Sequence, residues 1–503
     1  MRVRPAVLTL ALAASLASGC SDSGSKSDGE ENSSPAGAGK TGADTREAIA
    51  SVRSFKDPKV KVDLVGLNRF GGQHVVVQLR YTNTGSDPYG TEYMVQDIAV
   101  PNDATEGGDQ ASGIGLLDTA ARRVLLPYKQ GDACLCSSGN SSAGRDVLEA
   151  GEHATFFAVV PAPAQGAKTA TVVTPDTPPI PNVPISDEAP SAPPGQSIPT
   201  PGPGAQAVSH AMVATTEALD DTDETFDDGQ NVKVNLRADV LFALNKADLS
   251  PKAHAVLKDI AQQIDASSDT TVEVDGHTDN TGNDAINQPL SQRRAETVKK
   301  ALEGMVTRSG VTFQARGHGA QQPLYSNDSE EGRRRNRRVT VTFSRPQPAQ
   351  QTPSSAPSSG QAGPVKLTIE GTPMAAQVTG VKQLGNGFGL LTYRLTNEGS
   401  SESPMSSLNY GSDWKNQVQF FANNVGLVDP AGKRKYWPVI YPTDYPGNNE
   451  YATLATPTAG AWDARVKPQQ SRDFWAVVPL PPAASTFSVE IAKFPRIGGL
   501  SAS

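Results

Sequence analysis

The stretch GHTDNTGNDAINQPLSQRRAETV, residues 276–298, decides the fold at the centre of this 503-residue chain. It places a polar, glycine-bounded turn after a short alternating segment, and a helical pattern after that turn. Ser291 is a natural N-cap, so the sequence predicts a helix with the apolar stripe Ala295, Val298, Leu302 and Met305. Arg293 and Arg294 would then lie in the first turn, where the backbone dipoles disfavour a cation by roughly 0.3–1 kcal/mol. An arginine in that position calls for an anionic partner.

The segments around this stretch complete one domain over residues 230–345. Ser250 and Pro251 are predicted to begin a first helix, as N-cap and first helical residue. Alternating segments that predict strands are VKVNL (232–236), VEVDG (272–276), TFQARG (312–317) and VTVTF (339–343). The order of these elements predicts an α+β domain in which two helices cover a small mixed sheet.

Five successive motifs in this domain resemble those of the OmpA-like C-terminal domain. They are VLFALNKADLSP, GHTDNTG, NQPLSQRRAETV, ARGHGAQQP and NRRVTVTF, in that order. The resemblance covers about a fifth of the chain. It implies non-covalent binding of peptidoglycan through the diaminopimelate of the stem peptide. By position it assigns the two key roles to Asp279 and Arg294, places Thr278 and Asn287 near the ligand, and leaves Arg337 as a secondary wall contact.

The chemistry of the ligand agrees with these two residues. The side chain of diaminopimelate ends in an ammonium and a carboxylate, so its site needs one fixed anion and one fork of donors. Asp279 can take the ammonium, and Arg294 can bind the carboxylate through two parallel N–H···O bonds. A ligand carboxylate near a helix start would also offset the unfavourable position of the arginine. In the empty site we expect Asp279 and Arg294 to pair with each other.

The N-terminus predicts export and lipid anchoring. Residues 1–19 carry Arg2 and Arg4, an apolar run too short to span a bilayer, and small residues up to Cys20. This end resembles a lipobox, at which bacterial lipoproteins are cleaved and lipidated on the cysteine; an ordinary signal peptide is the alternative. Residues 20–57 read as a disordered tether. The predicted location is the extracytoplasmic cell envelope, on the cell membrane, or on an outer membrane if the host is Gram-negative.

Two β-rich regions flank the central domain. Residues 58–174 and 365–500 both alternate in strand fashion, and three blocks match between them in the same order. For example, VQLRYTNTGS (77–86) is echoed by LLTYRLTNEGS (390–400). We expect a duplicated all-β sandwich, similar to the immunoglobulin-like domains of exported lipoproteins. The predicted fold class is therefore multidomain, a central α+β domain between two β-sandwiches.

Two further segments read as linkers, residues 175–229 and 346–364. The first begins with a proline-rich spacer and ends in the acidic run DDTDETFDDG (220–229). That run lacks the glycine and glutamate spacing of a calcium loop, so a solvated acidic linker is expected.

Composition and motifs exclude several functions. The net charge of −8 argues against a nucleic-acid binder, although RRRNRR (333–338) forms a local basic run. His277 and His318 are far apart in sequence and lack neighbouring cysteines, so no metal site or cofactor is predicted. Cys134 and Cys136 form either a disulfide or two free thiols. No acid–base pair or nucleophile stands at a convincing spacing, so no enzyme is predicted.

The predicted function is a membrane-anchored envelope lipoprotein that tethers the membrane to peptidoglycan. In the alternative, the sandwiches bind an unknown protein or carbohydrate partner and the wall contact only positions them. The second copy carries a group of aromatic residues that would form either its core or a recognition face: Tyr436, Trp437, Tyr441, Tyr445 and Tyr451.

Overall fold

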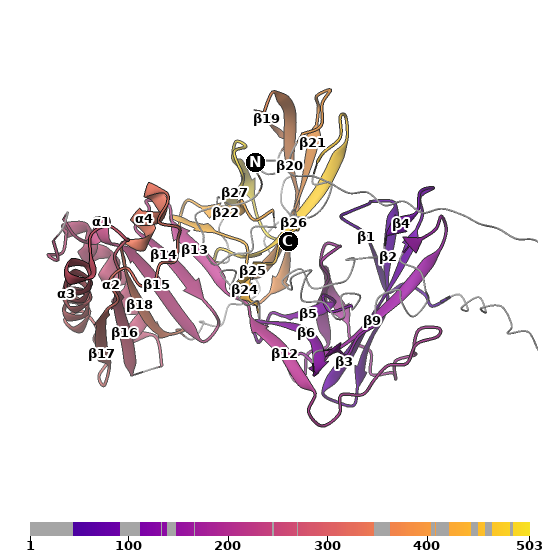
Figure 1. Ribbon diagram of the computed structural model, residues 1–503, viewed down its shortest axis with the longest axis horizontal. Coiled ribbons are helices and arrows are strands. Elements are labelled where there is room, and N and C mark those ends of the chain that lie inside the picture. Colours follow the sequence, from indigo (N-terminus) through magenta and orange to yellow (C-terminus); the bar gives the residue numbers. More distant parts are fainter. Residues whose placement is uncertain are drawn as a thin grey trace, which may run out of the picture. The chain divides into compact units, whose positions relative to one another are not determined.

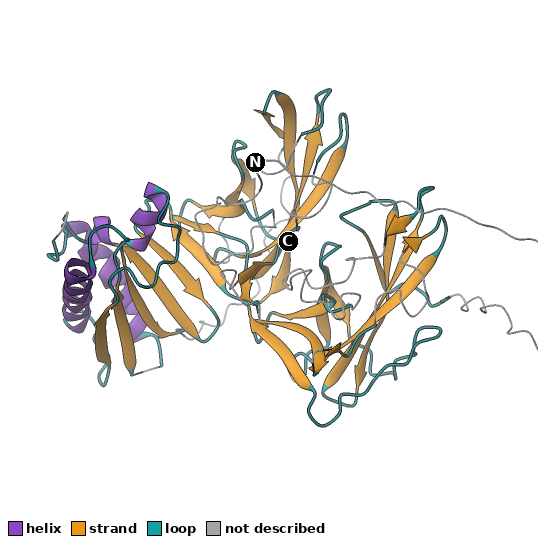
Figure 2. Cartoon of the chain, in the orientation of Figure 1, coloured by secondary structure: helices purple, strands orange, loops and turns teal. Residues whose placement is uncertain are grey.

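The computed structural model describes residues 44–90, 111–131, 133–137, 147–164, 166–243, 246–268, 270–346, 363–403, 408, 422–443, 451–457, 465–482 and 486–503. Cys20, the predicted signal segment 1–19, Tyr445 and nearly all of the predicted linker 346–364 lie outside these residues. Figure 1 shows the course of the chain, and Figure 2 shows that its helices are confined to one region while the rest is built of strands.

The central region is the predicted α+β domain. Its four predicted strands form one end of a ten-stranded sheet, in the order β17 (Thr312–Gly317), β16 (Thr271–Gly276), β18 (Arg338–Ser344) and β15 (Asn231–Arg237). Strands β16 and β17 are parallel, and the other pairs are antiparallel. The two long helices are α2 (Pro251–Asp265) and α3 (Asp284–Glu303). The shorter α1 (Ala238–Leu241) and α4 (Glu330–Asn336) add to the two helices that the sequence predicts.

Helix α2 begins where the sequence predicts. The side chain of Ser250 accepts a hydrogen bond from the backbone N–H of Ala253, and Pro251 occupies the first turn. Leu257, Ile260 and Ile264 are at most 2% exposed. They share one core with apolar residues of the sheet, including Val234, Val274 and Val341. The apolar residues at helical spacing in the sequence thus form the buried face of α2.

Helix α3 begins earlier than predicted. Its N-cap is Asn283, whose side chain accepts from the N–H of Ile286, and Pro289 lies inside the helix. Ser291 is a fully buried interior residue and not an N-cap. Asparagine caps a helix as well as serine does, so the chain offered two start sites and tertiary packing selected the first. Arg294 therefore lies more than two turns into the helix, and the argument from an unfavourable helix start is wrong.

Glycines at the ends of β16 and β17 let α3 approach the sheet. Gly276 and Gly317 are register partners on these two parallel strands. A Cβ atom on Gly276 would lie 2.1 Å from the carbonyl oxygen of Ser291, and one on Gly317 would lie 2.4 Å from the backbone nitrogen of Gln292. The hydroxyl of Ser291 also accepts a hydrogen bond from the N–H of Gly319. We call this close contact of Gly276 and Gly317 with the backbone of Ser291 and Gln292 the seat of α3, and only residues without a Cβ atom permit it.

The first β-rich region contains two main sheets. One has the order β1 (Ala50–Arg53), β2 (Val60–Phe70), β3 (His74–Asn83) and β9 (His153–Pro161). The second has the order β11 (Ile180–Pro184), β10 (Thr169–Val173), β5 (Gly115–Asp118), β6 (Arg123–Gln130) and β12 (Gln206–Ala211), with β7 (Ala133–Cys134) paired to β6. Short strands β4 (Tyr89–Gly90) and β8 (Val147–Leu148) pair separately.

The C-terminal region repeats this plan. One sheet has the order β19 (Val365–Ile369), β20 (Thr372–Gly385), β21 (Phe388–Asn397) and β26 (Ser471–Pro479). The facing strands are β23 (Arg434–Tyr436), β22 (Val425–Asp429), β27 (Phe487–Ile491) and β28 (Ile497–Leu500). Strands β24 (Ile440–Pro442) and β25 (Tyr451–Thr453) form a separate pair.

Matched hydrogen bonds support the duplication. The side chain of Asn83 accepts from the N–H of Gly85 at 2.9 Å, and that of Asn397 accepts from the N–H of Gly399 at 2.8 Å. The amide nitrogen of each asparagine donates to two backbone carbonyls, one of them four residues on. The repeated TNxGS sequence is thus a repeated turn held by a buried amide.

The boundaries of the linkers differ from the prediction. Residues 175–229 contain four strands and do not form a free spacer: β11 and β12 belong to the first sandwich, and β13 (Ala214–Ala218) pairs with β14 (Asp223–Asp227). Strand β14 extends the central sheet beyond β15, and β13 pairs with β23 of the C-terminal sandwich. The predicted tether also ends early, because the side chain of Asp44 is buried against Thr155 and Arg46.

The aromatic residues of the second copy are mainly core. Tyr436 and Tyr441 are each 9% exposed and belong to the core of the C-terminal sandwich. The indole N–H of Trp437 donates to Glu217, and the ammonium of Lys435 lies 3.6 Å from the centre of the indole ring. An aromatic recognition face is therefore not supported by these three residues.

The seat of α3 gives a first prediction. Gly276→Ala should lower the free energy of unfolding of the central domain by about 1–3 kcal/mol or more, because the added methyl group would overlap the backbone carbonyl of Ser291. The matched control is Gly304→Ala at the end of α3, where the nearest atom would be 3.6 Å away. Hydrogen exchange of β16 measures both; equal protection in the two variants would contradict the role of the seat.

Candidate functional site

Asp279 lies in the loop between β16 and α3 and is 4% exposed. Its Oδ2 accepts a hydrogen bond from Nη1 of Arg337 at 2.6 Å, and its Oδ1 accepts from the N–H of Thr281 at 2.9 Å and from the Thr281 hydroxyl. Burial alone would raise the pKa of Asp279, but the hydrogen bonds from Thr281 and Arg337 outweigh it and lower the pKa below its usual value. The side chain is a fixed carboxylate at neutral pH.

Arg294 projects from α3 and is 5% exposed. Its Nε donates to the carbonyl of Lys246 at 3.2 Å, and its guanidinium carbon lies 5.3 Å from the centre of the Phe242 ring. Burial and then the charge of Arg337 lower the pKa of Arg294, while the charge of Asp279 raises it. Among the described residues, its terminal nitrogens Nη1 and Nη2 donate to no acceptor. A buried guanidinium with unused donors is suited to an anion.

The ion pair that Asp279 forms is not the predicted one. Asp279 pairs with Arg337, whose other terminal nitrogen donates to Glu330 at 3.2 Å. Arg294 forms no salt bridge among the residues that the structure describes. The site thus brings one carboxylate and two guanidinium groups within electrostatic reach of each other. Arg337, a secondary candidate from the sequence, is the direct partner of Asp279.

The two polar candidates have different environments. The N–H of Thr278 donates to the carbonyl of Gly319 at 2.9 Å, but its hydroxyl is buried without a hydrogen-bond partner. Asn287 is 5% exposed, and its side-chain nitrogen donates to the carbonyl of Thr281 at 2.9 Å. Asn287 therefore fixes the loop that carries Asp279, whereas the Thr278 hydroxyl has hydrogen-bonding capacity left over.

His277 and His318, which are far apart in sequence, are neighbours in the fold. Their rings stack with centres 5.0 Å apart, and Nε2 of His318 lies 2.9 Å from Oδ1 of Asp275. Burial, followed by the charges of Arg338 and His318, lowers the pKa of His277 to about 2. In the part of the chain that the structure describes, no group of three or more His, Cys, Asp or Glu side chains can hold a metal ion.

The basic run at residues 333–338 is neutralised within the fold. Arg333 pairs with Glu330 at 2.9 Å and Arg334 with Glu331 at 2.8 Å. Arg335 pairs with Glu331 at 2.6 Å and with Glu217 of β13 at 3.1 Å. Arg338 is 4% exposed. The run is therefore not an open cationic surface for nucleic acid.

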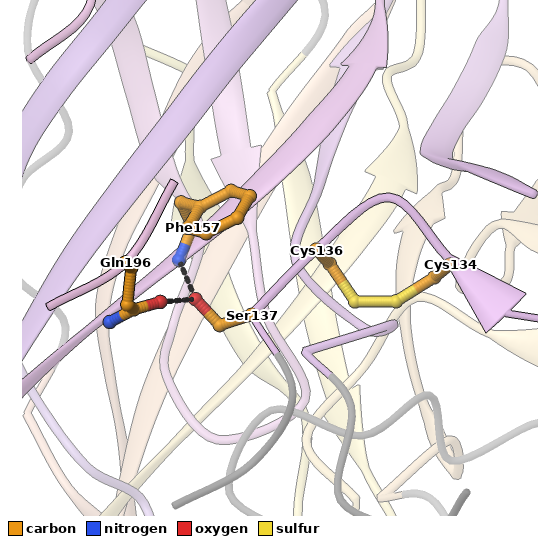
Figure 3. Close-up of a disulfide and its surroundings, with 5 residues drawn as sticks. All are labelled: Cys134, Cys136, Ser137, Phe157 and Gln196. Atoms are coloured by element: carbon orange, nitrogen blue, oxygen red, sulfur yellow. Dashed lines mark hydrogen bonds between the residues drawn. A yellow bond between two sulfur atoms is a disulfide. The ribbon is translucent and has the colours of Figure 1, made fainter. Parts of the chain in front are cut away.

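The structure joins Cys134 and Cys136 in a disulfide, one of the two states that the sequence leaves open (Figure 3). Beside it, the hydroxyl of Ser137 accepts from the N–H of Phe157 and donates to Gln196. Across the described residues, no helix combines the length and apolar character needed to cross a bilayer.

Comparison with known proteins identifies the class of this α+β domain. The OmpA family matches residues 241–337. Over 109 residues, 21% of this chain and 67% of the relative, the chain is 38% identical to the putative lipoprotein YfiB of Escherichia coli K12. The chain belongs to the OmpA family through this central domain.

Other relatives match over the same part of the chain. Outer membrane porin F of Pseudomonas fluorescens is 42% identical over 110 residues, which cover 22% of this chain and 33% of the relative. The peptidoglycan-binding protein ArfA of Mycobacterium bovis is 36% identical over 102 residues, 20% of this chain and 31% of the relative. The chain thus spans about a third of the length of these two relatives. A solved cell wall anchor of the T6SS from Pseudomonas aeruginosa is 32% identical with a TM-score of 0.23, over 25% of this chain and 88% of that one.

The buried histidine gives a prediction on pH. The folded-state pKa of His277 lies below its unfolded value of about 6.5, so the unfolded chain takes up a proton first as the pH falls. The free energy of unfolding of the central domain should therefore fall below about pH 6.5, by up to about 1.4 kcal/mol per pH unit. His277→Gln should remove this dependence, and the exposed His254→Gln should keep it. Hydrogen exchange of β16 at several pH values measures both; a pH dependence unchanged in His277→Gln would contradict the assignment.

Proposed function

We propose that the central domain binds peptidoglycan through the zwitterionic side-chain end of diaminopimelate. The observation that carries this proposal is a pair of opposite charges at one site: Asp279 and Arg294, 4% and 5% exposed. Burying a charge is costly unless a partner compensates it. Asp279 has partners within the protein, Thr281 and Arg337, whereas Arg294 donates through Nε alone among the described residues.

In this proposal the two ends of the ligand are recognised separately. The ligand ammonium binds the carboxylate of Asp279, next to the hydrogen bond from Arg337. The ligand carboxylate binds the free edge of the Arg294 guanidinium by two parallel bonds. The hydroxyl of Thr278, buried without a partner, supplies one more polar contact. Arg337 is already paired with Asp279 and Glu330, so Arg294 is the guanidinium left to bind the ligand carboxylate.

The relatives support the class of ligand. The relative from Mycobacterium bovis is named as a peptidoglycan-binding protein, and it shares 36% identity with this chain over 102 residues. The putative lipoprotein from Escherichia coli supports an envelope location. We extend peptidoglycan binding and an extracytoplasmic envelope location to this chain on that basis. We propose no enzymatic role.

We further propose that lipid on Cys20 anchors the chain to the membrane, so that the protein links membrane and wall. Two attached acyl chains give stable anchoring, since each buried methylene contributes about 0.8 kcal/mol. The domain plan is then a tether up to about residue 43, the first sandwich, the central domain over 230–345 and the second sandwich over 365–500. A wall site on an anchored protein need not be strong, because anchoring raises its effective concentration.

Substitutions at the site test wall binding. Asp279→Asn and Arg294→Gln should each reduce co-sedimentation with purified diaminopimelate-containing peptidoglycan at least about tenfold, since each leaves a ligand charge unpaired. The matched control is Arg293→Gln, which removes an exposed arginine from the adjacent position. Circular dichroism checks that all three variants are folded. Equal sedimentation of folded Arg294→Gln and Arg293→Gln would refute the site.

A separate substitution tests the anchor. Cys20→Ser removes the thiol to which the lipid would be attached, so the protein should move from the membrane fraction to the soluble fraction on fractionation of cells freed of their wall. The variant Cys136→Ser, which keeps Cys20, should remain in the membrane fraction. Retention of Cys20→Ser in the membrane would show that the anchor lies elsewhere.

A further inference from the structure

The duplicated sandwiches provide an internal comparison for the disulfide. The segment Cys134–Ser137 of the first copy corresponds to Thr453–Thr456 of the second. The N–H of Leu135 donates to the carbonyl of Tyr128 at 2.7 Å, and the N–H of Leu454 donates to that of Val439 at 2.8 Å. The carbonyls of the same two leucines accept from the following long strand, at 2.9 Å and 2.8 Å. The two copies place this segment in the same way.

The polar anchor of the segment is also repeated. The hydroxyl of Ser137 accepts from the N–H of Phe157 at 2.8 Å, and the hydroxyl of Thr456 accepts from the N–H of Trp475 at 2.7 Å. An isolated bridge follows in both copies, between Cys136 and Ala158 and between Ala455 and Ala476. The second copy therefore forms the whole arrangement without a thiol, which shows that the fold of the segment does not need a disulfide.

A disulfide that closes a loop of one residue also contributes little to the stability of the fold. The stabilisation from a disulfide comes mainly from closing a loop in the unfolded chain, and it decreases as the loop shortens. The loop between Cys134 and Cys136 holds a single residue. The two cysteines are thus better explained by their chemistry than by their contribution to the fold.

The residue opposite Cys134 differs between the copies in a way that suits thiol chemistry. Lys129 on β6 is the register partner of Cys134 on β7, whereas Ile440 is the partner of Thr453 in the second copy. Directly opposed side chains of an antiparallel pair project to the same face, with Cβ atoms about 4.5–5.5 Å apart. A lysine beside a cysteine stabilises the thiolate.

The solvent exposure of this register pair also differs between the two copies. Ile440 and Thr453 are each 2% exposed, whereas Lys129, Cys134 and Cys136 are all partly exposed. Cys136 packs against the core of the first sandwich, and Cys134 lies on the short edge strand β7. Where the second copy has a buried isoleucine and threonine, the first copy has a partly exposed lysine and cysteine (Figure 3 shows the bridge).

We propose that the Cys134–Cys136 disulfide is a thiol–disulfide exchange site that accepts electrons from a dithiol of an exported client protein, with Lys129 as the residue that promotes exchange. A client thiolate attacks Sγ of Cys136, the bond between the two sulfurs breaks, and Cys134 leaves as a thiolate stabilised by Lys129. The second client thiolate then attacks the client sulfur of the mixed disulfide, and Cys136 leaves as a thiolate. The client is oxidised to a disulfide, the bridge is reduced to two thiols, and the two client protons end on Cys134 and Cys136.

The test uses the full chain with Cys20→Ser, so that the only cysteines are Cys134 and Cys136, and dithiothreitol as the dithiol. Bridge opening is followed by alkylation of the released thiols and mass measurement. We expect exchange at neutral pH, slowed about threefold or more by Lys129→Ile, because the thiolate loses its neighbouring cation. The control Lys168→Ile removes an exposed lysine of the same sandwich and should leave the rate unchanged.

A second measurement separates exchange from a structural role. The double variant Cys134→Thr, Cys136→Ala installs the residues of the second copy, and its melting temperature should stay within about 2 °C of the parent, because the shared hydrogen bonds hold the segment. A bridge that resists dithiothreitol, an exchange rate indifferent to Lys129→Ile, or a melting temperature lowered by many degrees in the double variant would each overturn the proposal.

Discussion

The close approach of α3 to the ends of β16 and β17 is the constraint on which the site depends. Gly276 and Gly317 leave no side chain between the strands and the backbone of Ser291 and Gln292. Asp279 follows Gly276 by three residues, and Arg294 follows Ser291 by three. The contact between glycine and helix therefore sets how far apart the two charged side chains stand. A methyl group on the strand would separate them without touching either one.

Charge compensation is the second organising factor, and it extends beyond the site. Arg337 holds Asp279, and the neighbouring Arg335 reaches Glu217 on β13 and Glu224 on β14. The hydroxyl of Tyr325 donates to both oxygens of Glu224, at 2.6 Å and 2.7 Å. Buried ions are tolerated only when such partners surround them. The basic run and the acidic run, which look like two solvated segments, are the two halves of one network.

The duplication shows which residues a sandwich of this kind needs and which are additions. The asparagine of each TNxGS turn makes the same bonds in both copies, so it serves the fold. The cysteines and Lys129 stand only in the first copy, at positions where the second copy has Thr453, Ala455 and Ile440. A repeated domain thus separates structural residues from chemical ones within a single chain.

The sequence by itself determined the fold class, four strands and the two long helices of the central domain, and the duplication, and it predicted Asp279, Arg294 and Arg337 as site residues. These follow from local signals: hydrophobic spacing, the Ser250 cap and motifs in a fixed order. Only the tertiary structure decided that α3 begins after Asn283, that Asp279 pairs with Arg337, and that residues 175–229 form strands. Those outcomes depend on groups far apart in sequence, such as Glu224 and Arg335, and no local pattern reports which distant charge a side chain will meet. The acidic run 220–229 looks like a solvated linker in sequence, but the fold pairs its acids with arginines of α4. Helix α3 has two possible N-caps, and its packing against the sheet selects Asn283.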